Sequence, residues 1–106
     1  MTEKELQKKC VALLEDLENL EKNKIPEFVE DILEIQRLQT LTDKGWQTIS
    51  YILLVAYGGP TIYINGVDKV IEGYWGGEKV TIPFSEKARK NWQEVEDYLD
   101  EIFEET

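Results

Sequence analysis

The most informative stretch of this chain is Tyr57-Gly58-Gly59-Pro60-Thr61-Ile62-Tyr63-Ile64, followed by Gly73-Tyr74-Trp75-Gly76-Gly77. Glycine permits positive φ and close backbone approach, whereas proline fixes φ and removes a donor, so neither is typical inside a regular strand. Here they separate short segments of β-branched and aromatic residues, which favour strands. The spacing therefore predicts hairpins whose turns lie beside large aromatic rings.

Before and after this run, further segments of β-branched and aromatic residues predict additional strands of the same sheet. The segment after the turn at Thr42–Gly45 is apolar on both faces, which is typical of a strand inside a sheet. The last predicted strand carries Pro83, which an edge strand tolerates. The four predicted strands are Trp46–Tyr57, Thr61–Ile64, Val70–Trp75 and Lys79–Phe84.

Apolar residues at three- and four-residue spacing predict helices at both ends of the chain. Thr2 and Glu5 form a capping box for a helix over residues 3–22 whose buried stripe includes Cys10, and Pro26 suits the first turn of a second helix reaching Arg37. Ser85 caps the last helix. The predicted stripe of the second helix is Phe28, Val29, Ile32, Leu33 and Ile35. The predicted stripe of the last helix is Ala88, Trp92, Val95, Leu99 and Ile102.

These elements predict an α+β fold in the order α-α-β-β-β-β-α. The sheet is expected to be an antiparallel meander of three to four strands, with two N-terminal helices and one C-terminal helix packed on it. With 106 residues, the chain is expected to form a single domain over residues 1–106.

The composition indicates where in the cell the protein is expected to act. The longest apolar run, Ile52–Tyr57, is far shorter than the roughly 20 residues that span a bilayer, and Met1–Glu5 lacks an apolar signal-peptide region. Cys10 is the single cysteine and cannot form an internal disulfide. We therefore expect a cytoplasmic protein without a membrane partner.

The formal net charge of −10 is concentrated at the C-terminal end, where seven acidic residues and no basic residue occur from Glu94 to Glu105. Such a surface repels phosphate backbones, so direct nucleic-acid binding is disfavoured. A basic protein is the favoured partner. The simpler interpretation is that the acidic residues keep a small domain in solution.

The chain resembles a set of small uncharacterised proteins encoded by bacteriophages, prophages and related mobile elements. The resemblance is carried by the segment from Gly58 to Ile64, the Glu72–Gly77 segment and the acidic last helix. The similarity covers residues 50–103 best. It implies a viral or mobile-element setting, in which small acidic proteins often bind and block host proteins. The family carries no assigned activity that the resemblance could transfer to this chain.

The sequence lacks the residues that several common catalytic mechanisms require. There is no histidine, which excludes a histidine-assisted serine or cysteine nucleophile and, with one cysteine, makes a structural zinc site improbable. Glu72 is the one candidate for acid–base chemistry, with an exposed sheet face as its simpler interpretation. We expect a non-enzymatic protein with no cofactor and no metal.

Two sets of residues are candidate binding surfaces. In the first set, aromatic rings surround a Gly-Gly-Pro turn, as in surfaces that bind proteins or flat ligands. In the second set, carboxylates follow the last helix and are expected to face solvent. The first set is Tyr57, Gly58, Gly59, Pro60, Tyr63, Tyr74 and Trp75. The second set is Asp97, Asp100, Glu101 and Glu104.

These sets support two binding hypotheses. The leading hypothesis is an acidic interaction protein that occludes a basic, nucleic-acid-handling host protein. The alternative is a small-ligand-binding protein that uses Tyr57, Tyr74 and Trp75 around Gly58-Gly59-Pro60. An enzyme would depend on Glu72 or Asp68 and tyrosines, and a homodimer stays open.

Overall fold

The computed structural model describes residues 1–104, with the backbone alone described for Glu104. All five strands pair antiparallel, in the order β1-β2-β3-β4-β5. The α+β class and the antiparallel meander are confirmed, with five strands instead of the expected three or four. The elements are α1 (Glu3–Glu18), the 3₁₀ turn η1 (Lys22–Lys24), α2 (Ile25–Glu30), β1 (Glu34–Thr42), β2 (Gly45–Ala56), β3 (Thr61–Asn65), β4 (Val70–Trp75), β5 (Glu78–Pro83) and α3 (Glu86–Glu104).

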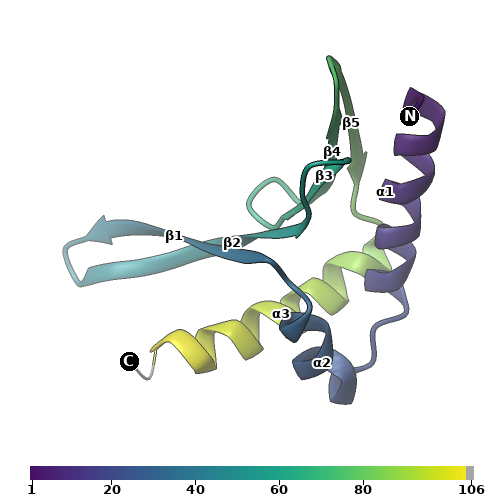
Figure 1. The fold of residues 1–106 in the computed structure, drawn as a ribbon. Coiled ribbons are helices and arrows are strands. Elements are labelled where there is room, and N and C mark those ends of the chain that lie inside the picture. Colours follow the sequence, from purple (N-terminus) through teal and green to yellow (C-terminus); the bar gives the residue numbers. More distant parts are fainter. Residues whose placement is uncertain (105–106) are drawn as a thin grey trace.

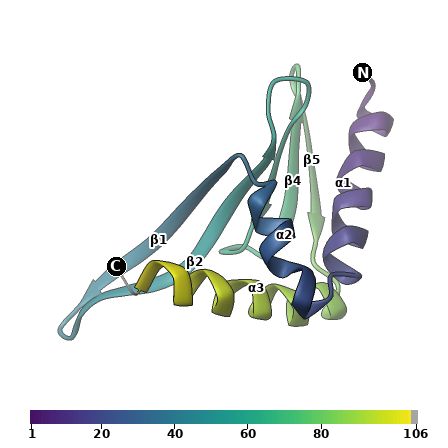
Figure 2. The ribbon, with the colours of Figure 1, turned by 60° about the horizontal axis from the view of Figure 1, so that its bottom comes forward.

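The long helices cover one face of the sheet (Figures 1 and 2). The helix α1 lies along β4 and β5, while α3 contacts α1 and then runs beside β2. The β1–β2 hairpin extends away from the rest of the sheet, and in both views its turn lies beyond the C-terminal end of α3. The protein is therefore elongated, with extents of 46 × 29 × 24 Å.

The first helix begins as the sequence predicts, but it ends at Glu18, four residues before the expected end at residue 22. The Glu5 backbone N–H donates to the Thr2 hydroxyl at 3.2 Å, which satisfies one of the unpaired donors of the first turn. Leu6, Cys10 and Leu17 recur on one face and are fully buried. Burial raises the pKa of the Cys10 thiol, because the buried environment disfavours the charged thiolate.

The last helix is capped as predicted, since the Ala88 N–H donates to the Ser85 hydroxyl at 3.2 Å. Its stripe from Ala88 to Leu99 is fully buried, with Trp92 against Phe84 at 6.0 Å between ring centroids. The prediction that Ile102 continues this stripe is wrong, because its side chain is 39% exposed. Phe103 instead packs at the edge of the core beside Tyr51.

The predicted second helix is wrong beyond its first turns. Only Ile25–Glu30 are helical in α2, and the residues from Glu34 to Thr42 form β1. Within the predicted stripe, Phe28, Val29, Ile32 and Ile35 are partly buried, while Leu33 is 61% exposed. Nine residues of β1 find backbone partners on β2, which outweighs the weak helical spacing of the same residues.

The sheet has a buried face and an open face. Ile62, Gly73 and Val80 lie opposite one another on β3, β4 and β5 and are buried beneath the helices. The alternate residues Tyr63, Glu72 and Thr81 lie on the other face. Within residues 1–104, no helix is both long and apolar enough to cross a membrane.

Candidate functional site

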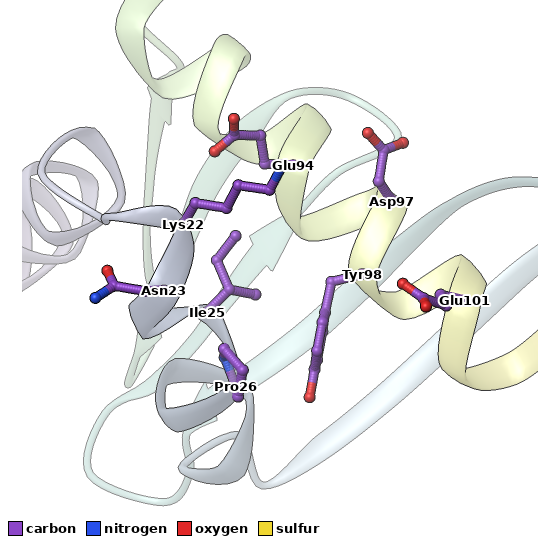
Figure 3. A pocket seen from close by; sticks show the side chains of 8 residues that line it. All are labelled: Lys22, Asn23, Ile25, Pro26, Glu94, Asp97, Tyr98 and Glu101. Carbon is purple, nitrogen blue, oxygen red and sulfur yellow. The ribbon is translucent and has the colours of Figure 1, made fainter.

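A pocket of about 270 Å³ lies between α3 and the wall formed by η1 and the start of α2 (Figure 3). Asp97, Tyr98 and Glu101 project from α3, and Ile25 and Pro26 project from the facing wall. The full lining is Lys22, Asn23, Ile25, Pro26, Glu94, Asp97, Tyr98 and Glu101. The pocket thus joins three carboxylates to an apolar floor, with one lysine among its lining residues.

Helical spacing places the three carboxylates together. Glu94, Asp97 and Glu101 are three and four residues apart, so they follow one face of α3. Asp97 and Glu101 are exposed, whereas Glu94 is half-buried. Asp97 also accepts a hydrogen bond of 3.1 Å from the Gln93 side-chain amide.

Other acidic residues of α3 turn toward the sheet. The Tyr51 hydroxyl donates to the Asp100 carboxylate at 2.6 Å, and the Ser50 hydroxyl donates to Glu96 at 2.5 Å. The expectation that Asp100 faces solvent is therefore wrong, because it helps to fix α3 on β2. The Glu104 side chain lies outside the described residues. Of the four predicted acidic site residues, the structure brings Asp97 and Glu101 together in the pocket.

The predicted aromatic set lies elsewhere, around the β2–β3 and β4–β5 turns. Gly58 has a φ of +94°, a conformation that suits glycine, and the Gly59–Pro60 peptide bond is cis. The Trp75 ring packs over Gly59, where an added Cβ would lie 3.3 Å from the ring. A shallow hollow of about 420 Å³ is lined by Gly58, Thr61, Tyr74, Trp75 and Gly76.

Not all predicted members of this set line the hollow. Tyr57 is 77% exposed, Pro60 is buried, and Tyr63 contacts the Tyr74 ring edge-on at 6.1 Å between centroids. The lining of the hollow shares no residue with the pocket beside α3. The structure therefore separates the two predicted surfaces.

Glu72 is the centre of a polar cluster on the open face of the sheet. Its carboxylate accepts hydrogen bonds from the Asn65 amide at 2.9 Å and the Tyr74 hydroxyl at 3.1 Å, and pairs with Lys79 at 3.5 Å. The pKa of the Lys79 ammonium is raised, mainly by its interaction with the Tyr74 side chain and to a smaller extent by the negative charge of Glu72. The Asn65 amide also donates to Asp68 at 3.2 Å. These contacts link β3, β4 and β5, and they occupy the carboxylate with groups of the same sheet.

The pocket wall that faces α3 was not predicted from the sequence. Glu94 and Tyr98 could have been found, because they share helical spacing with Asp97 and Glu101. The contribution of Lys22 to Pro26 could not, since it depends on how the α1–α2 connection returns to α3. Among the described residues, no group of three or more acidic or cysteine side chains is arranged to hold a metal ion.

Comparison of the chain with protein-family models, with curated proteins and with solved structures found no match.

Proposed function

We propose that this protein is a non-enzymatic interaction protein that binds a basic protein through the pocket between α2 and α3. The observation that supports the proposal is the composition of the pocket: Glu94, Asp97 and Glu101 stand beside an apolar floor. Lysine and arginine combine an aliphatic stem with a cationic head. A partner side chain of this kind would place its stem on Ile25, Pro26 and Tyr98 and its head among the carboxylates.

The charge of the whole chain supports the same partner class. A net charge of −10 attracts basic surfaces and accelerates their association, whereas it repels nucleic acid. Surfaces that hold nucleic acid are basic, so a nucleic-acid-handling host protein is the proposed target. The carboxylates of α3 would occupy a groove that otherwise receives phosphates. A phage or mobile-element origin and a cytoplasmic location belong to this proposal.

The experiment measures binding of a fluorescent peptide of alternating lysine and serine by anisotropy. The variant Glu94→Gln/Asp97→Asn/Glu101→Gln removes the three pocket charges with little change in side-chain size. We expect its Kd to rise by about tenfold or more, and binding by the unaltered protein to weaken as salt increases.

A matched control separates the pocket from net charge. Glu15→Gln/Glu78→Gln/Glu86→Gln neutralises three exposed acidic residues outside the pocket, giving the same net charge. We expect its Kd to change by less than about twofold. Equal loss of binding in the two triple variants would show that only overall charge matters, and salt-independent binding would eliminate the electrostatic mechanism.

A second candidate function is small-ligand binding in the hollow beside Trp75. The observation in its favour is that Tyr74 and Trp75 line one hollow together with Gly58 and Gly76, which carry no side chains to cover the rings. Aromatic faces of this kind can stack on a flat ligand. This candidate would take first place if the pocket variants bound the basic peptide unchanged.

A further inference from the structure

The end of the β1–β2 hairpin, here called the arm and comprising residues 38–50, carries uncovered apolar side chains. Leu41 and Trp46 are opposite each other in the β1–β2 register and are 65% and 66% exposed. Ile49 is 53% exposed and lies where the register shifts opposite Leu38 and Gln39. Large apolar side chains gathered on one projecting element are typical of an interaction surface.

Leu41 and Trp46 of the arm lie on the sheet face that α3 contacts nearer the core. Ile35 and Arg37 alternate with Leu41 along β1, and Arg37 reaches α3, where its guanidinium donates to the Phe103 carbonyl at 3.2 Å. The described part of α3 ends at Glu104, and the turn of the arm extends past it (Figure 2). The turn of the arm therefore lies beyond the helix that covers the sheet nearer the core.

The outer edge of β1 is also without a strand partner in the described structure. Its nine residues include neither proline nor lysine, the residues that commonly protect an edge from pairing. The opposite edge, β5, carries both Lys79 and Pro83. The edge of β1 is therefore the one that is open to addition of another strand.

Charge indicates which partner fits this surface. Residues 34–56, which comprise β1, its turn and β2, contain Glu34, Arg37, Asp43 and Lys44 as their only charged residues and are neutral overall in a chain of net charge −10. Two copies of such an acidic chain repel each other over most of their surfaces, but not at the arm. A second copy can pair with this edge without placing acidic residues of the paired strands opposite each other.

We propose that the protein forms a two-fold symmetric dimer in which β1 pairs antiparallel with β1 of a second copy. A two-fold axis at Leu38 would place Ile35 opposite Leu41 of the other copy. The same register would place Arg37 opposite Gln39, so like charges do not face each other. Trp46 lies on β2 opposite Leu41, one strand away from the new seam between the two β1 strands.

Sedimentation velocity over about 1 to 200 μM protein tests the dimer directly, because weak homodimers appear in this range. We expect the unaltered protein to shift from monomer to dimer, and Trp46→Glu to weaken the dimer by at least about tenfold. Leu41→Glu provides a second variant with the same expectation. Tyr57→Glu adds the same charge at an exposed aromatic residue outside the arm and should dimerise like the unaltered protein.

Hydrogen exchange identifies the pairing edge in the same samples. Amides of β1 should become more protected as protein concentration rises, while those of β5 should not. Since two acidic copies meet, added salt should strengthen the dimer, opposite to the salt effect expected for a basic partner. A monomer at every concentration, a dimer unaffected by Trp46→Glu and Leu41→Glu, or concentration-independent exchange in β1 would overturn the proposal.

Discussion

Gly73 lies beneath α1, where a side chain would meet the Cys10 sulfur. An added Cβ would be 2.5 Å from that sulfur and 3.0 Å from the Leu6 Cδ1 atom. A glycine inside a strand indicates close approach of another element, and on that ground the sequence marks Gly73 as unusual. The sequence could not identify which element approaches, because the contact joins residues far apart in the chain.

We predict that Gly73→Ala lowers the free energy of unfolding by about 1–3 kcal/mol, the usual effect of overpacking a core. Urea denaturation measures this loss. Gly77→Ala is the matched control, because an added Cβ there meets nothing within 4 Å.

A double-mutant cycle tests the cause. If the Cys10 sulfur is the obstacle, the double variant Cys10→Ala/Gly73→Ala should lose less free energy of unfolding than the sum of the losses in the two single variants. Strictly additive effects would show that another contact determines the need for glycine at this position.

At the scale of elements, β1 shows why the sequence prediction succeeded for most of the fold and failed for one segment. The capped helices at the two ends have long stripes that only a helix explains. Residues 34–37, which the helical spacing assigned to the end of the second helix, instead pair with β2, and this pairing decides that they form a strand. The turn at Thr42–Gly45, where Gly45 has a φ of +102°, was expected, but the threonines before it were not recognised as part of the first strand of a hairpin.

The same limit applies to the acidic residues of α3. Their spacing showed that they lie on a helix, but two helical faces carry carboxylates, and the direction of each depends on β2 and on the α1–α2 connection. Asp100 is used in folding, whereas Asp97 lines the pocket. A charge run alone could not separate these roles.

We predict that Tyr51→Phe lowers the free energy of unfolding by about 1.5–3 kcal/mol, since the lost hydroxyl donates to a charged carboxylate in a partly buried position. Tyr57→Phe should have almost no effect, because Tyr57 is 77% exposed. Chemical denaturation of the two variants makes the comparison. Equal midpoints would mean that the contact between Tyr51 and Asp100 does not hold α3 on the sheet.

At the scale of the whole molecule, repulsion among acidic residues opposes folding. The chain has 22 acidic and 12 basic residues, and the described residues form only two ion pairs, Lys24–Glu27 and Lys79–Glu72. Added salt shortens the screening length from about 30 Å at 0.01 M to about 8 Å at 0.15 M. Because few attractions are lost, screening should remove more repulsion than attraction.

We therefore predict that raising sodium chloride from about 0.01 to 0.15 M increases the free energy of unfolding by about 1 kcal/mol, raising Tm by about 4–8 °C. The Glu15→Gln/Glu78→Gln/Glu86→Gln variant should respond less, because it has less repulsion to screen. Calorimetry at several salt concentrations measures both proteins, and a Tm that falls with salt would contradict the prediction. Folding would thus strengthen under the conditions that weaken binding of a basic peptide, so loss of the peptide at high salt could not be attributed to unfolding.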